Sequence, residues 1–262
     1  MAITDIGSAS PIDLLTPRLD ADIFSNYPDA TFYVGILAVP GLVVQPSAWQ
    51  AARCLRANVY IDEKQFLPPS ARQLDGGEQD EYDERSVQFG IVENRGDSAA
   101  MVGTSRLILK RDSDETLPVE KMFPELFDTQ AALPDTSETS RYIARHPNRS
   151  TQHAVGIALV RAMTLYAVDK DTPNSYAVVE RSLAKIFDWI HLPYRVMTAP
   201  KPIAYYNNTQ NLAIGINGHE IVDAGLNTRM GSEKMNRLFR PEVVGRLGLG
   251  GFDATLTEVI QE

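Results

Sequence analysis

The chain has 262 residues, of which 44% are apolar and 23% charged, so it is long enough to bury the core of one large domain or of two small ones. Its 34 acidic and 25 basic side chains give a formal net charge of -9, which disfavours a general nucleic-acid binder and suits small cationic or zwitterionic ligands. A single cysteine, Cys54, excludes an internal disulfide and a multi-cysteine metal site.

The hydropathy pattern predicts no membrane span. The longest nearly apolar run, from Gly35 to Val44, is broken by Pro40 and is far shorter than the ~18 residues that a span requires. The amino-terminal residues show no basic start followed by an apolar block, so they do not resemble a secretory signal. A cytoplasmic location is therefore expected.

The first half of the chain predicts strands around one helix. Residues 1–30 lack a sustained period and are expected to form an amino-terminal extension. A strand is expected at 31–38, a helix from Pro46 to Tyr60, and a mobile polar loop from Leu67 to Glu84. Two strands, 86–94 and 100–110, then follow with a turn at 94–97 between them, which predicts a hairpin.

The second half alternates helices and strands. The periodicity predicts helices around 119–127, 153–168 and 183–190. It predicts strands at 138–143 (ETSRYI), 175–179, 194–198 and 211–222. This order is typical of an α+β chain with a mixed, mainly antiparallel sheet. Residues 226–262 are expected to form a carboxy-terminal extension that packs on a core domain spanning 31–225.

Common catalytic and cofactor motifs are missing from the sequence. It contains no G-x-S-x-G elbow, no P-loop and no H-E-x-x-H, and its carboxy-terminal glycines do not have the spacing of a dinucleotide fingerprint. The histidines are scattered, with no third ligand near any pair, so no metal site is expected.

Charged residues occur where the pattern expects apolar ones. A lone charge in a half-buried strand costs several kcal/mol unless it is paired, so we predict that three acids and three bases form one network. The alternative is a solvated sheet face, which carries charges freely. The predicted network comprises Arg56, Asp80, Asp83, Arg106, Glu138 and Arg141.

Six short blocks follow one another along residues 31–225. They are Arg56-x-x-Val59-Tyr60, Phe66, Asp80-Glu81-Tyr82-Asp83, Gly103-Thr104-Ser105-Arg106-Leu107, Phe123-Pro124-Glu125-Leu126 and Glu138-Thr139-Ser140-Arg141-Tyr142. In their order and with similar gaps, these blocks resemble the signature motifs of the acyl-homoserine-lactone synthases, the autoinducer synthases of bacterial quorum sensing. That family belongs to the GNAT acyltransferases.

The resemblance implies a GNAT-like three-layer α/β/α sandwich whose sheet is split into a V-shaped cleft. It also implies a β-bulge in the strand that holds Glu138 and Arg141. Residues three apart in a regular strand point to opposite faces, so only such a bulge would turn both side chains toward one site.

The resemblance further implies aminolysis of an acyl thioester. Glu138 is expected to act as the general base, with Arg106 and Arg141 beside it as catalytic residues that orient the acceptor. Asp80 and Asp83 would attract a cationic acceptor. The remaining expected substrate contacts are Arg56, Tyr60, Phe66, Phe123 and Ser140.

No tightly bound cofactor is expected, and both substrates follow from the resemblance. The acceptor would be S-adenosylmethionine. Residues 145–152 lack the glycines with which acetyl-CoA-using GNAT enzymes cradle a pyrophosphate, so acyl-phosphopantetheine on an acyl carrier protein is favoured over acyl-CoA. An acidic carrier protein would need a basic patch on this acidic chain. Candidates for that patch are Arg145, Arg149, Arg161 and Lys170.

Two other functions stay open. Ser137 and Phe66 stand where the family usually has tryptophan, and Tyr60 and Tyr142 where it has phenylalanine. The first two differences favour an enzyme that acylates an amino acid or another small amine. A non-catalytic module that binds acyl groups or carrier protein is the other alternative, although such a module would not need the base Glu138.

Overall fold

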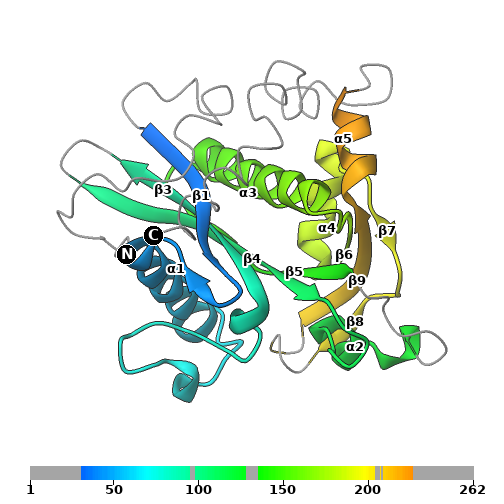
Figure 1. Ribbon diagram of the computed structural model, residues 1–262, viewed down its shortest axis with the longest axis horizontal. Helices are drawn as coiled ribbons and strands as arrows, with labels where there is room; N and C mark the ends of the chain where they lie inside the picture. The colour runs from blue at the N-terminus through cyan, green and yellow to red at the C-terminus, as the bar shows by residue number, and fades with distance from the viewer. Residues whose placement is uncertain (1–30, 95–97, 128–134, 204–206, 208, 227–262) are drawn as a thin grey trace. The chain divides into compact units, whose positions relative to one another are not determined.

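The computed structural model describes residues 31–94, 98–127, 135–203, 207 and 209–226 (Figure 1). The chain divides into two compact units. Within the described residues, the first unit comprises 31–94, 98–106 and 141–163, and the second comprises 107–127, 135–140, 164–203, 207 and 209–226. The division falls inside β4 (Ala99–Lys110), β5 (Thr136–Ala144) and α3 (Arg149–Asp169), so each of these elements contributes to both units.

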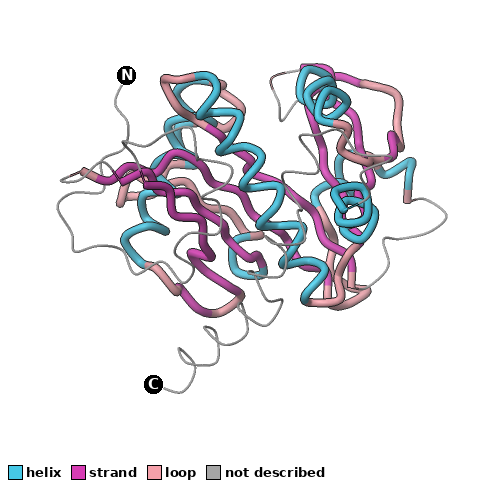
Figure 2. The backbone as a smooth tube through the Cα atoms, turned by 90° about the horizontal axis from the view of Figure 1, so that it is seen from above, coloured by secondary structure: helices cyan, strands magenta, loops and turns pink. Residues whose placement is uncertain are grey.

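The first unit is built on antiparallel strands. β1 (Thr31–Val39) pairs with β2 (Leu42–Val43) on one side and with β3 (Ser86–Asn94) on the other, and the strand order is β2-β1-β3-β4. Strands and helices of the described residues are distinguished in Figure 2. Gly41 has φ +81° in the short turn from β1 to β2, a conformation that glycine adopts without steric cost.

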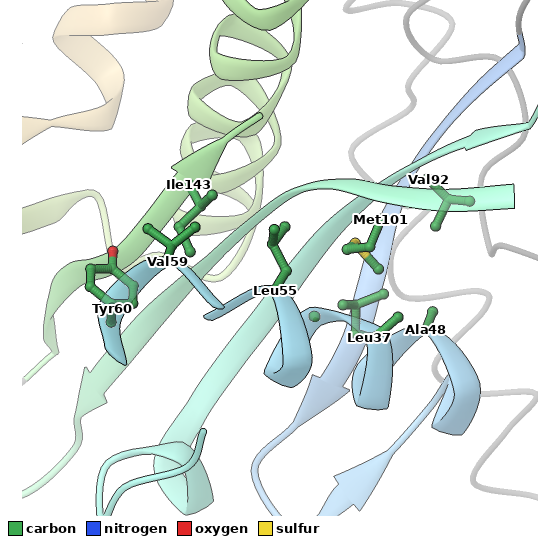
Figure 3. Packing of buried hydrophobic residues seen from close by; sticks show 10 residues of the cluster. Leu37, Ala48, Leu55, Val59, Tyr60, Val92, Met101 and Ile143 are labelled. Atoms are coloured by element: carbon green, nitrogen blue, oxygen red, sulfur yellow. The ribbon is translucent and has the colours of Figure 1, made fainter. Parts of the chain in front are cut away.

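The core of this unit lies between α1 (Pro46–Ala57) and the strands (Figure 3). Pro46 opens the helix at a position where no intrahelical N–H is required. Ala48, Ala52 and Leu55 recur along its buried face, as their three- and four-residue spacing predicts. A π-helical turn, Asn58–Glu63, continues α1 and adds further buried residues to the same cluster. The cluster comprises Leu37, Ala48, Ala51, Ala52, Leu55, Val59, Tyr60, Val92, Met101 and Ile143.

The second unit contains the parallel pair of the mixed sheet. β5 pairs in parallel with β6 (Asn174–Glu180), in the register Ser137↔Ser175. β6 pairs antiparallel with β9 (Thr209–Asn217), which also pairs with β7 (Arg195–Val196) and β8 (Lys201–Ile203). Among the described residues of this unit, the α-helices that lie wholly within it are α2 (Pro118–Met122), α4 (Arg181–Ile190) and α5 (Gly218–Leu226).

The mixed, mainly antiparallel sheet is confirmed, although the short strands β2 and β8 were not predicted, and further differences from expectation lie at element ends. The helix expected at 119–127 stops at Met122, because Pro124 cannot donate to a continuing helix and opens a 3-10 turn instead. The strand expected at 211–222 ends at Asn217, whose side-chain oxygen accepts the Glu220 N–H and so caps α5.

Some expectations fall outside the described residues. These are the two extensions, apart from Leu226, and most of the turn between β3 and β4. In the part of the chain that the structure describes, none of the helices is both long and apolar enough to cross a membrane.

Candidate active site

The strand β5 departs from regular geometry at the place that the ETSRYI segment predicts. Arg141 has φ +53°, a left-handed conformation that is uncommon for a residue other than glycine. Glu138 and Arg141 are both buried, as a local irregularity between them would allow. Such a residue persists only where the surrounding contacts hold it in place.

Those contacts come from a closed cycle of buried ion pairs in the first unit, which we call the charge ring. Its members alternate in sign, and each contacts both of its neighbours. The order is Arg56, Glu78, Arg141, Asp80, Arg106 and Asp83, returning to Arg56.

The distances around the charge ring are those of charge-assisted hydrogen bonds. Arg56 donates to Glu78 at 2.5 Å and, through its two terminal nitrogens, to both oxygens of Asp83 at 2.9 and 2.8 Å. Arg141 donates to Glu78 at 2.8 Å and to Asp80 at 2.9 Å. Arg106 donates to Asp80 at 2.5 Å and to Asp83 at 2.9 Å.

Burial makes this pairing necessary. Arg56 is fully buried, and Asp80, with a side chain 26% exposed, is the most accessible member of the charge ring. Burial opposes the ionised form of Asp83, but the charges of Arg56 and Arg106 outweigh it and hold the pKa of this carboxyl well below its usual value. The pKa values of Glu78 and Asp80 are lowered for the same reason, against the same opposition from burial. The three acids are therefore held ionised opposite three cations.

Each arginine of the charge ring also lies over an aromatic ring, which adds cation–π attraction. The distances from the guanidinium carbon to the ring centroid are 5.5 Å for Arg56 over Trp49, 5.6 Å for Arg106 over Tyr82, and 5.2 Å for Arg141 over Tyr60. Tyr60 in turn lies beside Phe66, with ring centroids 6.1 Å apart. Two of the predicted aromatic contacts, Tyr60 and Phe66, therefore stand next to the charge ring.

All three acids of the charge ring come from the polar loop from Leu67 to Glu84, which the sequence predicts as mobile. Their ion pairs hold that loop in place. The Asp80 backbone N–H donates to Asp83 at 3.0 Å, and the Glu78 N–H donates to the carbonyl of Arg53 at 3.0 Å. A Cβ on Gly77 would lie 2.8 Å from the Cβ of Arg53, so the close approach of loop and helix requires glycine there.

The structure thus joins five of the six predicted charges and adds Glu78, which the sequence analysis missed. Glu138 belongs to the second unit, where its Oε2 accepts the Val119 backbone N–H at 2.7 Å near the start of α2. Ser140 and Phe123 also belong to that unit. Phe123 is fully buried, and the Lys201 ammonium lies 4.4 Å from the centre of its ring.

The expected basic patch needs correction. Arg161 is only 2% exposed, because α3 is buried around almost its whole circumference at that point. Arg145 forms an ion pair with Glu63, and Lys170 forms one with Asp169 at 3.4 Å. Of the four candidates, Arg149 is exposed, whereas Arg145 and Lys170 are half-buried.

Comparison with known proteins identifies the fold. Residues 55–158 match the family model described as an acetyltransferase (GNAT) domain. No curated protein gives a significant sequence match.

Among solved structures, BjaI, a CoA-dependent acyl-homoserine lactone synthase with SAM and isopentyl-CoA, matches with a TM-score of 0.59 and 17% identity over 83% of this chain and 90% of its own. The AHL synthase LasI matches with a TM-score of 0.55 and 17% identity over 72% of this chain and 91% of its own. FeeM, an N-acyl amino acid synthase from uncultured soil microbes, matches with a TM-score of 0.51 and 15% identity over 73% of this chain and 92% of its own.

These matches define the fold of the chain as a GNAT fold, within which residues 55–158 are similar to an acetyltransferase (GNAT) domain. The similarity to acyl-homoserine lactone synthases that the sequence motifs indicate is confirmed at the level of the fold.

Proposed function

We propose that the protein transfers a fatty acyl group from a carrier-protein thioester to the α-amine of S-adenosylmethionine and releases an acyl-homoserine lactone. The observation that carries the proposal is the charge ring. In a GNAT fold, it brings together residues from four separate signature blocks and Glu78, which lies just before one of them. Even a fully paired ring of buried charges stabilises a fold no better than apolar side chains of similar volume, so its presence favours a role beyond stability.

The acceptor is proposed from the electrostatics of the ring's accessible corner. Asp80 is the acid of the charge ring that solvent reaches, and its side chain already holds Arg106 and Arg141. A carboxylate at such a corner attracts an acceptor that carries an ammonium and a sulfonium group. Tyr60 and Phe66, beside the ring, supply aromatic surface on which a cation can lie.

Glu138 is proposed as the general base. An α-amine with a pKa near ~8 is mostly protonated at neutral pH, and only its free base attacks a carbonyl carbon. Glu138 would take that proton directly or through a water molecule, while the Val119 N–H fixes the position of its carboxylate. Phe123 and Ser140, on the same unit, are proposed substrate contacts.

Bond changes in the proposed reaction follow in two steps. The amine nitrogen forms the amide bond, and the bond from the thioester carbon to sulfur breaks, so the pantetheine thiol leaves with a proton. The methionyl carboxylate then attacks its own γ-carbon, and the carbon–sulfonium bond breaks to give the lactone and methylthioadenosine. BjaI structures hold SAM with isopentyl-CoA in one case and MTA in another, which supports this pair of substrate and product.

The test uses purified protein with an acyl carrier-protein thioester and S-adenosylmethionine, with mass spectrometry of the products. An acyl-homoserine lactone and an equal amount of methylthioadenosine are expected. Formation of an acylated amino acid alone would rule out the lactone product. We also propose a cytoplasmic location, because the acyl carrier-protein thioester and S-adenosylmethionine would both be present there.

A second candidate is an N-acyl amino acid synthase. The fold similarity to FeeM supports it, as do Ser137 and Phe66 at positions where the synthase motifs usually have tryptophan. The same assay with free amino acids in place of S-adenosylmethionine separates the two. A non-catalytic binding module would give no product with either acceptor.

A further inference from the structure

A tyrosine lies directly beside the proposed base in the sheet of the second unit. β5 and β6 pair in parallel with Glu138 opposite Tyr176. Residues that lie opposite each other on neighbouring strands point to the same face of the sheet, so these two side chains share a face. Glu138 is buried and Tyr176 is half-buried, so solvent reaches this pair at the tyrosine.

The short helix α2 lies against this face and fixes two carboxylates there. The Val119 N–H donates to Glu138 at 2.7 Å, and the Leu117 N–H donates to Glu120 at 2.7 Å. α2 also packs against β6, the strand of the tyrosine. Glu120 is paired with the ammonium of Lys110 at 3.0 and 3.1 Å. Donors of the chain itself therefore hold both carboxylates in position.

The ring of Tyr176 is held in place, but the chain does not use its hydroxyl. The ring packs edge-to-face on Phe127, with centroids 5.6 Å apart and 87° between the ring planes. Burial raises the pKa of the hydroxyl above its ordinary value, and the Glu120 carboxylate adds to this, so the group is protonated at neutral pH. Among the residues that the structure describes, none forms a hydrogen bond with this hydroxyl.

A second tyrosine of the same unit gives a matched contrast. Tyr194 is also half-buried, and it also packs edge-to-face on a phenylalanine, Phe187, with centroids 6.0 Å apart. Its hydroxyl, however, donates to the carboxylate of Asp188 at 2.6 Å. The two settings differ in whether the chain itself uses the hydroxyl, which favours a ligand-binding role for Tyr176.

The charge beside Tyr176 determines which way its hydroxyl points. A hydroxyl dipole orients in the field of the protein, and the Glu120 carboxylate attracts its proton. The lone pairs of the oxygen then face away from Glu120 and can accept a hydrogen bond. A protonated amine carries several N–H donors and no acceptor, so it matches a carboxylate beside a hydroxyl oxygen.

We propose that the protonated amine of the acceptor binds between the carboxylate of Glu138 and the hydroxyl oxygen of Tyr176. One N–H then donates to Glu138, which takes that proton, and a second donates to Tyr176, which stops the amine from rotating. The lone pair that deprotonation frees is thereby held in one direction for attack on the thioester. No proton moves to or from Tyr176. This inference rests on the proposed function for an amine acceptor, but not for the identity of the acceptor or of the acyl donor.

The experiment compares two ligands that differ in the amine. Tyr176→Phe keeps the ring against Phe127 and removes the hydroxyl. Calorimetry without an acyl donor should show S-adenosylmethionine binding about three- to tenfold more weakly to Y176F than to the unaltered protein. Methylthioadenosine, which has no α-amine, should bind equally to both. In the matched control, Tyr194→Phe, the free energy of unfolding should fall because Asp188 loses a donor, and both affinities should stay unchanged.

Transfer kinetics give a second readout. Y176F should raise KM for the amine acceptor and leave KM for the acyl thioester unchanged. An unchanged affinity for S-adenosylmethionine in Y176F would overturn the inference. Equal weakening of both ligands would overturn it too, because the tyrosine would then only support the fold around the site.

The inference and the proposed function fail separately. Binding of S-adenosylmethionine that depends on Tyr176, without formation of lactone, would support the inference and contradict the proposed function. If the unaltered protein binds no S-adenosylmethionine, the lactone function fails. The same comparison is then made between an amino acid that the protein acylates and the matching acid without its amine. A protein that binds neither acceptor would overturn both.

Discussion

Buried charge is arranged differently in the two units. In the first unit, six charges form the charge ring, in which every acid contacts two guanidinium groups. In the second unit, Lys110 pairs with Glu120 at 3.0 Å, and Glu138 takes a hydrogen bond from a neutral backbone donor. The ring suits a framework, because protonation of any acid would leave a buried arginine short of a partner. A carboxylate positioned by an amide suits a proton acceptor.

The largest expected effect is on catalysis, and it tests whether Glu138 is a proton acceptor or only a structural residue. Glu138→Gln keeps an oxygen that can accept the Val119 N–H, so the fold should be retained. The rate of acyl transfer should fall by about 10² to 10⁴ if the carboxylate takes the proton. Single-turnover kinetics with acyl carrier protein and S-adenosylmethionine measure this loss. Glu125→Gln, at an exposed residue, is the matched control, and an undiminished rate in E138Q would dismiss Glu138 as the base.

The next effect tests the charge ring as a framework. Arg56→Ala leaves Glu78 and Asp83 each without one of their two guanidinium partners in a buried setting. The free energy of unfolding should fall by about 3 to 5 kcal/mol, or the protein should fail to fold. Urea unfolding followed by fluorescence measures the loss. Arg72→Ala, which removes an exposed pair with Asp62, should cost less than about 1 kcal/mol, and equal losses in the two variants would contradict the framework role.

Acid should weaken the charge ring in a defined direction. The pKa values of Glu78, Asp80 and Asp83 are lowered in the folded chain, so these groups stabilise it above their ordinary values of 4.5 and 3.8. That stability is lost as the pH falls below those values, because the unfolded chain then binds more protons than the folded one. These groups should not change the urea concentration at the midpoint of unfolding between pH 6 and 8. Below about pH 4.5 that concentration should decrease. Asp83→Asn should reduce that slope, and an unchanged slope would show that other groups govern it.

The smallest expected effect comes from the pair in the second unit. Lys110→Met preserves length and removes the charge that Glu120 faces, but Glu120 still accepts the Leu117 N–H at 2.7 Å. We expect a loss of about 1 to 3 kcal/mol in the free energy of unfolding. The same urea titration compares it directly with Arg56→Ala. A loss in K110M as large as in the ring variant would remove the distinction between the two units.

Much of the site could be read from the sequence, because a charge in an apolar strand is conspicuous. Arg106 and Arg141 interrupt buried strands, and Arg56 lies on the buried face of a helix, so each needed a partner. The carboxylates Asp80 and Asp83 were the nearest candidates in the motif order. The resemblance to the synthases implied an irregular backbone in this strand, and the strand period agreed with it, since two residues three apart point to opposite faces of a regular strand.

Glu78 and Arg161 show where the pattern stops being informative. Glu78 lies in a loop rich in acids, where one more carboxylate attracts no notice, and its partner Arg141 is 63 residues away. Arg161 was predicted as part of a basic patch for carrier protein, but α3 is buried nearly all round at that point, and the sequence of a single helix does not show which segments cover it. Both depend on contacts between distant segments, which periodicity does not encode.

The left-handed residue at 141 also limits how the gene can change. The charge ring holds Arg141 between two carboxylates, so Arg141 cannot shift along the strand. If one residue were inserted or deleted just before Arg141, the part of the strand that contains Glu138 would have to shift instead. Such a change would turn Glu138 toward the opposite face of β5. Length variation between these two positions should therefore be far rarer among working copies of this gene than substitution at Thr139 or Ser140.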